Sequence, residues 1–153
     1  HGMAEEEAIA STKSSLIEKY QIYQYALQCG IDISDEELDQ ILKQYQEEFA
    51  DDAVRSEYET IYEEAGTTLQ ESLEKNRELI RIEKTIKKLY QKLQNDFRDG
   101  KTKVGNKDCK DVNEYYLTYV EEIVKKSIGE TEQKKIEKSL EDVEKYYRDS
   151  KIE

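Results

Sequence analysis

The sequence of 153 residues contains no proline and only six glycines. An average chain of this length carries about seven prolines, and both residue types interrupt helices. Their scarcity predicts that long helices make up most of the chain. Since no segment shows the period-two alternation that is typical of a strand, we expect an all-α fold.

Apolar residues recur at helical spacing in about six segments, and the fourth is the long central helix. Its apolar residues form a heptad seam, and a lone helix cannot bury such a seam, so other helices or a second chain must cover it. The seam consists of Leu79, Ile82, Ile86, Leu89 and Leu93. The expected helices span about 5–29, 35–49, 54–65, 69–97, 112–128 and 131–149.

Capping motifs mark the places where one helix ends and the next begins. In the segment CGIDISDEELDQIL, Gly30 suits the position after a helix, and Ser34 with Glu37 forms a capping box. We therefore expect a sharp joint between the first two helices. The same capping pair recurs as Thr68 with Glu71 and as Asp111 with Glu114.

These boundaries favour a single domain. Residues 1–3 are interpreted as the remnant of an expression tag, and residues 4–97 as a helical core. Residues 98–110 are expected to form a polar, basic loop. Residues 111–153 are then expected to form C-terminal helices that pack on the core.

The charge balance excludes several classes of partner. The chain has 24 basic and 36 acidic residues, which gives a formal net charge of -12. Nucleic-acid binding needs clustered cations, so we expect no nucleic-acid partner. An anionic membrane surface is disfavoured for the same reason, and no apolar run approaches the roughly 18 residues of a transmembrane helix.

The residues that usually perform catalysis or bind cofactors and metals are missing. The single histidine, His1, belongs to the tag remnant, so the commonest general base and metal ligand is absent from the rest of the chain. A calcium loop near the fourth helix end is excluded because Phe97 and Asn106 occupy ligand positions. We therefore predict no catalytic, cofactor or metal site, no enzyme activity and no small-molecule substrate.

Two cysteines, Cys29 and Cys109, lie 80 positions apart. They are either two separate thiols or a disulfide, and a disulfide needs Cα atoms within about 7 Å of each other. Without a histidine or a second cysteine pair they do not make a zinc site.

Tyrosine is unusually abundant, with twelve tyrosines against two phenylalanines and no tryptophan. Its apolar ring and polar hydroxyl suit half-buried and contact positions. The tyrosines either line a modest core or form an amphipathic binding surface. Four of them lie beside the main apolar stripes, and we expect these to be more exposed and to contact a bound partner: Tyr25, Tyr90, Tyr116 and Tyr146.

The joints also follow one another in a distinctive order. Within about residues 16–92 the chain contains ALQCGI at 26–31, ISDEEL at 33–38, AG at 65–66, TLQESL at 68–73 and IEKTI at 82–86. In this order and spacing they resemble the helical chaperone domain of the SurA and PrsA type, whose fold is similar to the C-terminal domain of trigger factor. The strand-like segment that usually opens this domain is absent here.

The resemblance implies a non-catalytic, chaperone-like module that binds unfolded or partly folded polypeptides. No segment resembles the parvulin isomerase domain that many members of the family carry. Because these proteins act mostly outside the cytoplasm, often as lipoproteins, we expect an envelope or secreted protein whose signal lies outside this sequence, with a cytoplasmic protein as the alternative. The competing hypothesis is a helical structural or adaptor protein that forms a homodimer through its fourth helix.

Overall fold

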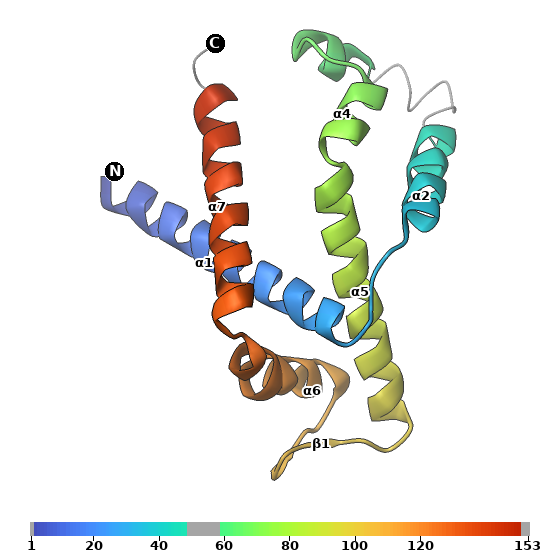
Figure 1. Ribbon diagram of the computed structural model, residues 1–153, viewed down its shortest axis with the longest axis vertical. Helices are drawn as coiled ribbons and strands as arrows, with labels where there is room; N and C mark the ends of the chain where they lie inside the picture. The colour runs from blue at the N-terminus through green and yellow to red at the C-terminus, as the bar shows by residue number, and fades with distance from the viewer. Residues whose placement is uncertain (1, 49–58, 151–153) are drawn as a thin grey trace. The chain divides into compact units, whose positions relative to one another are not determined.

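A computed structural model describes residues 2–48 and 59–150, and describes side chains over 13–48 and 59–145. Helices dominate it, which confirms the all-α expectation (Figure 1). None of the helices in this part of the chain is long and apolar enough to cross a membrane. The helices are α1 (Gly2–Gln28), α2 (Asp35–Glu48), α4 (Leu69–Lys75), α5 (Arg77–Arg98), α6 (Val112–Tyr119) and α7 (Glu130–Ser150).

The helix expected at 54–65 is described only in part. Residues 59–64 are helical, and the expected start of this helix lies outside the described residues. The helix ends in front of Gly66, whose φ is 73°. A positive φ at this position is typical of a helix that ends at glycine.

The chain forms two compact units. Unit 1 comprises residues 1–31 and 86–153, and unit 2 comprises residues 32–85. Helix α5 begins in unit 2 and ends in unit 1. Within unit 1, α1 packs against α7, so the first and last helices of the chain share one unit although the whole sequence separates them.

The joint after α1 has the predicted capping geometry. Gly30 has a φ of 76°, and the N–H of Ile31 donates to the carbonyl oxygen of Ala26 at 2.8 Å. The N–H of Glu37 donates to Ser34 Oγ at 3.1 Å and starts α2. The capping predictions are therefore confirmed. The equivalent bonds from Glu71 to Thr68 and from Glu114 to Asp111 measure 3.2 and 2.8 Å.

The prediction of one uninterrupted helix over 69–97 is wrong. Asn76, with φ −96° and ψ 8°, separates α4 from α5. Its side-chain Nδ2 donates to the carbonyl oxygen of Ser72 at 2.8 Å. Asparagine side chains that bond to nearby backbone compete with regular helix. The spacing of the apolar residues around Asn76 does not indicate this bond, so the interruption could not be predicted.

The segment 98–110 was predicted to be a loop without strands. This prediction is wrong, because the segment contains a hairpin. Strand β1 (Lys103–Val104) pairs antiparallel with β2 (Lys107–Asp108). Val104 and Cys109 are buried, so the hairpin contributes to the core of unit 1. Strands of two residues are too short to produce a periodic apolar pattern, which is why the sequence did not reveal them.

The helix expected over 112–128 changes its form along its length. α6 is followed by a π-helical turn at Val120–Val124 and a 3₁₀ turn at Lys125–Ser127. Val120 and Val124 are both buried. Residues four apart lie on the same side of a helix, so both valines reach the core.

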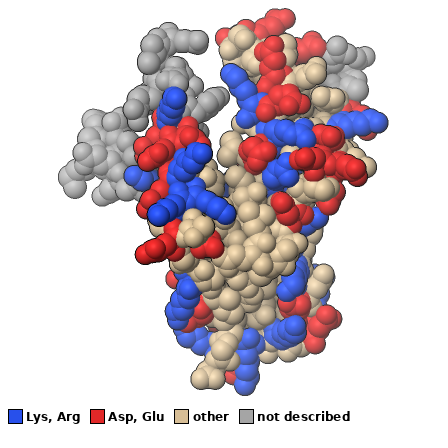
Figure 2. Space-filling model, viewed as in Figure 1, with Lys and Arg blue, Asp and Glu red and all other residues tan. Residues whose placement is uncertain are grey.

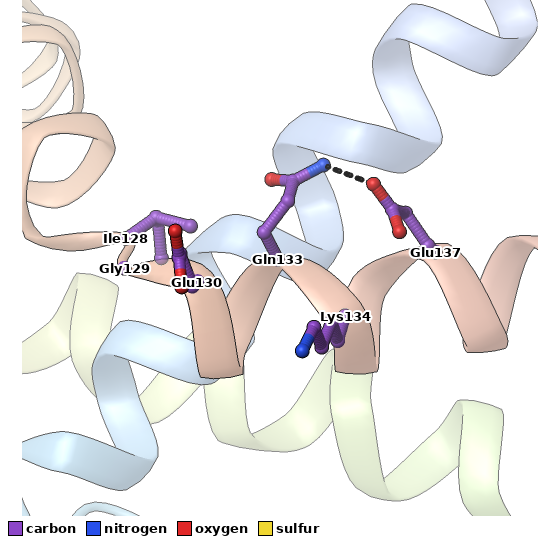
Figure 3. A pocket seen from close by; sticks show the side chains of 6 residues that line it. All are labelled: Ile128, Gly129, Glu130, Gln133, Lys134 and Glu137. Carbon is purple, nitrogen blue, oxygen red and sulfur yellow. Dashed lines mark hydrogen bonds between the residues drawn. The ribbon is translucent and has the colours of Figure 1, made fainter.

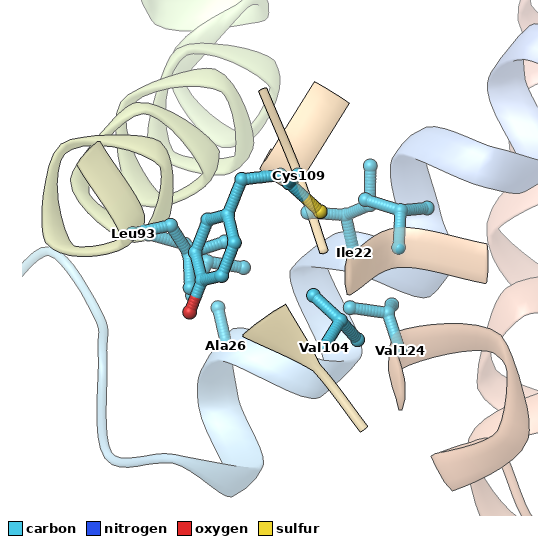
Figure 4. Close-up of a cluster of buried hydrophobic side chains, with 9 residues drawn as sticks. Ile22, Ala26, Leu93, Val104, Cys109 and Val124 are labelled. Atoms are coloured by element: carbon cyan, nitrogen blue, oxygen red, sulfur yellow. The ribbon is translucent and has the colours of Figure 1, made fainter. Parts of the chain in front are cut away.

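The core of unit 1 joins α1, the end of α5, the hairpin, α6 and the π turn (Figure 4). Leu89 and Leu93 of the heptad seam are each 1% exposed. This half of the seam is therefore covered within the chain. The buried cluster consists of Ile22, Ala26, Leu89, Leu93, Val104, Cys109, Tyr115, Val120 and Val124.

The core of unit 2 is smaller and lies at the start of α2. Ile33, Leu38 and Leu42 are buried together, and Leu73 of α4 and Ile80 of α5 pack against them. Ile33 directly precedes the capping serine and Leu38 follows it by one turn, which is the arrangement of a hydrophobic staple.

Two arginines of α5 bind the first turns of α2. Arg81 Nη1 donates to the carbonyl oxygen of Ile33 at 2.7 Å, and its Nη2 pairs with the carboxylate of Asp35. Arg77 Nη2 lies 2.7 Å from Asp39 Oδ1. These contacts could not be predicted from the sequence, because partners 38 to 48 positions apart leave no local pattern.

Candidate functional site

Three of the four predicted contact tyrosines lie in unit 1, on three different helices. Tyr25 is on α1, Tyr90 on α5 and Tyr116 on α6, and each is half-buried. Tyr25 and Tyr116 pack against the buried cluster, so they are less exposed than expected. The side chain of Tyr146 lies outside the described residues.

The half-buried tyrosines form two edge-to-face pairs. The rings of Tyr90 and Tyr116 have centroids 5.0 Å apart and an interplanar angle of 77°. Tyr25 pairs with Tyr119 at 5.8 Å and 69°, and the hydroxyls of this second pair share a hydrogen bond. Edge-to-face packing is the favoured geometry of aromatic pairs. We call these four residues the tyrosine surface.

Two further aromatic rings lie next to Tyr119 of the tyrosine surface. The ring of Tyr115 is 4% exposed and lies 6.1 Å from that of Tyr119. On its other side, Phe97 of α5 lies 5.7 Å from Tyr115. The Tyr25–Tyr119 pair is therefore held by the core of unit 1, which reduces the entropy that it loses when a partner binds.

Burial raises the pKa of two phenol groups of this surface, those of Tyr25 and Tyr116. Burial, together with the hydrogen bond to Tyr119 and the neighbouring Cys29, raises the pKa of Tyr25 well above its ordinary value. Burial also raises the pKa of Tyr116, with smaller contributions from Glu18 and Tyr90. Protonated phenols can donate and accept hydrogen bonds, but they are not activated nucleophiles or bases.

The same unit exposes an apolar side chain next to Tyr116. The side chain of Leu117 is 52% exposed. Figure 2 shows uncharged side chains gathered in the lower half of the view, where the end of α5, α6 and the hairpin of unit 1 lie. Leu117 and the half-buried tyrosines give unit 1 apolar and aromatic groups that a partner can contact.

Charged side chains hold the elements that border this face. Lys107 of β2 donates to Glu122 in the π turn at 2.6 Å, and Lys126 donates to the same carboxyl group at 2.9 Å. These two hydrogen bonds lower the pKa of Glu122 to about 2. Lys125 pairs with Glu121 and lies 3.7 Å from Glu18 of α1. The hairpin and the π turn are thus tied together by ionised groups.

Two surface hollows differ from this face because charged and amide groups line them. One lies at the start of α7, where Gln133 donates to Glu137 at 3.5 Å (Figure 3). The other runs along α4. Both are open to solvent. The first is lined by Ile128, Gly129, Glu130, Gln133, Lys134 and Glu137, and the second by Thr68, Gln70, Glu71, Glu74 and Lys75.

The thiols and the acidic side chains form no metal centre within the described part of the chain. No group of three or more histidine, cysteine, aspartate or glutamate side chains there is placed to hold a metal ion. Cys29 is exposed and Cys109 is buried, and both are free thiols. Of the two alternatives drawn from the sequence, the structure thus has the separate thiols.

Comparison with known proteins identifies no relative of this chain. No protein-family model, no curated protein and no solved structure matches the chain. What the site can do is therefore argued from its own residues.

Proposed function

We propose that the protein is a non-catalytic, chaperone-like module that binds unfolded or partly folded polypeptides. The tyrosine surface of unit 1 carries this proposal, because it offers two pairs of half-buried rings to a partner. Tyrosine gives large contact area with few rotatable bonds, and its hydroxyl can bond to an extended backbone. Such a surface accepts many sequences, since rings and hydroxyls require no particular partner side chain.

The order of joints that resembles the SurA and PrsA type of domain supports the same proposal. Two of its pieces, ISDEEL and TLQESL, contain the capping residues Ser34 and Thr68, whose side chains accept the backbone N–H bonds that start helices. The raised pKa values of Tyr25 and Tyr116 favour binding over chemistry at this surface.

The competing adaptor hypothesis has less support from the geometry. It needs the heptad seam of α5 to be available to a second chain. Leu89 and Leu93 are instead buried inside unit 1, and only Leu79, at 39% exposure, is left open along the seam. A coiled-coil dimer needs several consecutive seam positions. A salt-independent dimer in sedimentation experiments at micromolar concentration would favour the adaptor hypothesis instead.

The proposal is tested by binding of unfolded peptides to the full chain. We expect the tyrosine ring signals of unit 1 to shift in NMR titrations with an unfolded peptide of 20 residues. Tyr90→Ala should weaken binding about tenfold, as for a residue that contributes strongly to an interface. Tyr45→Ala, which removes a half-buried tyrosine of unit 2, is the matched control. If the protein neither binds such peptides nor slows the aggregation of a heat-unfolded client, the proposal is wrong.

A further inference from the structure

Charge is unevenly distributed along the chain. Unit 2 contains 17 acidic and 6 basic residues, whereas unit 1 contains 19 acidic and 18 basic residues. Within unit 1, the segment 86–110 contains eight basic and three acidic residues, which gives it a net charge of +5. This segment comprises the end of α5 and the hairpin. The chain is therefore acidic as a whole but basic in the segment that carries Tyr90.

One face of α5 carries cations on both sides of Tyr90. Four residues follow one another at intervals of three, four and four positions, which places them on the same face of the helix: Lys87, Tyr90, Gln94 and Arg98. We call these four residues the basic face. Lys87 and Arg98 are exposed, and neither forms an ion pair with another described residue. Both cations are thus available to a partner.

The acidic side chains of the segment are largely engaged by its other lysines. Asp96 pairs with Lys92 at 3.5 Å and with Lys101 at 4.0 Å. Asp108 pairs with Lys103 at 3.7 Å. These local pairs leave the two cations of the basic face as the positive charges that a partner can neutralise.

Tyr90 connects the basic face to α6. Its ring packs edge to face on that of Tyr116, with centroids 5.0 Å apart, and Tyr116 packs against the buried cluster of unit 1. Burial and, to a smaller extent, the carboxylate of Glu18 raise the pKa of Tyr116. Glu18 also lies 3.7 Å from Lys125, which offsets its charge. An aromatic contact site and two unpaired cations are therefore combined along one side of α5.

We propose that the basic face binds extended polypeptide segments in which an apolar or aromatic side chain lies between acidic residues. The inference rests on the proposed function and names its client class. Lys87 and Arg98 are eleven positions apart, so they are separated by about 16 Å along the helix axis. An extended segment covers that distance with about five residues. Carboxylates at its two ends can pair with the cations while a side chain between them contacts Tyr90 and Tyr116.

Charge complementarity favours this occupant over others. A carboxylate beside Lys87 or Arg98 is attracted, whereas a lysine at the same position is repelled. Nucleic acid is a poorer match, because its phosphates extend well beyond this face and meet a chain with a net charge of -12. At physiological salt the screening length is about 8 Å, so a bound segment responds to the basic face more strongly than to acidic residues farther away.

The experiment compares two unfolded 20-residue peptides that share every apolar residue and differ in having glutamate or lysine at the charged positions. Dissociation constants for the full chain are measured at 150 and 500 mM salt. We expect the glutamate peptide to bind about fivefold more tightly at 150 mM salt, and this difference to shrink at 500 mM.

Two charge-matched variants locate the effect. Lys87→Gln/Arg98→Gln neutralises the two cations of the basic face, and Lys134→Gln/Lys138→Gln neutralises two exposed lysines on α7 of the same unit. Both variants have the same net charge. We expect the first to weaken glutamate-peptide binding about fivefold at 150 mM salt and the second to change it less than twofold.

The outcomes separate this inference from the proposed function. Equal binding of both peptides, tighter binding of the lysine peptide, or equal weakening by both variants overturns the inference and leaves the proposed function intact. Failure of both peptides to bind overturns the proposed function as well. Salt-sensitive self-association in sedimentation experiments that is lost in Lys87→Gln/Arg98→Gln would show that the basic face binds the acidic unit 2 of a second copy, and would also overturn the inference.

Discussion

Arg81 of α5 donates a hydrogen bond from Nη1 to the backbone carbonyl oxygen of Ile33 at 2.7 Å. The same guanidinium pairs with Asp35, and only 15% of the Arg81 side chain is exposed. It thus bonds the backbone just before the capping serine and a carboxylate just after it. A guanidinium can do this because its donors are fixed in a planar fork.

Arg81→Met should therefore destabilise unit 2. The substitution leaves the carbonyl oxygen of Ile33 without its donor, at a cost of about 1–3 kcal/mol in the free energy of unfolding. Hydrogen exchange of the α2 amides should rise by the corresponding factor. Arg77→Met, which removes only a pair with the exposed carboxylate of Asp39, is the control and should have a smaller effect. Equal effects of the two substitutions would contradict this role of Arg81.

A substitution at Thr85 of α5 is expected to stabilise the protein. Its side chain is 0% exposed, and its hydroxyl has no hydrogen-bond partner among the described residues. Thr85→Val replaces the hydroxyl with a methyl group of similar size, so it should stabilise the protein by about 1 kcal/mol. The midpoint of urea unfolding measures the change. Thr85→Ser keeps the hydroxyl but removes the methyl group, and it should destabilise.

The tyrosine pair of α1 and α6 predicts coupled effects on stability. Tyr25→Phe or Tyr119→Phe each leaves one hydroxyl without its partner and should cost about 1 kcal/mol. The double substitution removes both hydroxyls and should cost less than the sum of the two single changes. A double-mutant cycle in urea measures this coupling. Strictly additive costs would show that the hydrogen bond of this pair does not contribute.

The Lys107–Glu122 contact predicts a pH dependence for the hairpin. The pKa of Glu122 is lowered from 4.5 to about 2 in the folded protein. The folded state therefore favours the ionised carboxyl group. This contribution to stability is fully present above pH 4.5 and is lost as the pH falls through about 2.

This prediction is checked by following the carboxyl carbon of Glu122 in an NMR titration. Lys107→Gln removes the largest cause of the shift and should raise the pKa of Glu122 toward its ordinary value. Lys103→Gln, which removes the 3.7 Å pair with Asp108 on the same hairpin, is the control and should leave that pKa unchanged. An unchanged pKa in Lys107→Gln would refute the proposed cause.

The parts of the fold that were predictable depend on local chemistry. The start at Ser34 and the end at Gly30 follow from side chains and backbone conformations within a few residues. The break at Asn76 and the hairpin around Val104 were missed, because each depends on a single side-chain bond or on burial by distant elements. The π turn at Val120–Val124 likewise preserves ordinary helical spacing in the sequence.

The sequence indicated which residues the candidate site contains, but not how they are arranged in space. Their positions beside the main apolar stripes marked Tyr25, Tyr90 and Tyr116 as candidate contact residues. Which tyrosines pair depends on how α1, α5 and α6 pack in three dimensions, and the partner of Tyr25 proved to be Tyr119. The uneven charge of the two units could be counted along the sequence, but only the structure shows where the unit boundaries lie.

The labelling rates of the two thiols can be used to measure local opening of unit 1. Cys29 is exposed and reacts with a probe from the folded state, whereas Cys109 is buried beside Val104 and reacts only when the hairpin leaves the core. The ratio of the two labelling rates therefore measures how often this end of unit 1 opens. No residue has to be introduced for that measurement, so the native sequence can be followed while a client peptide is present.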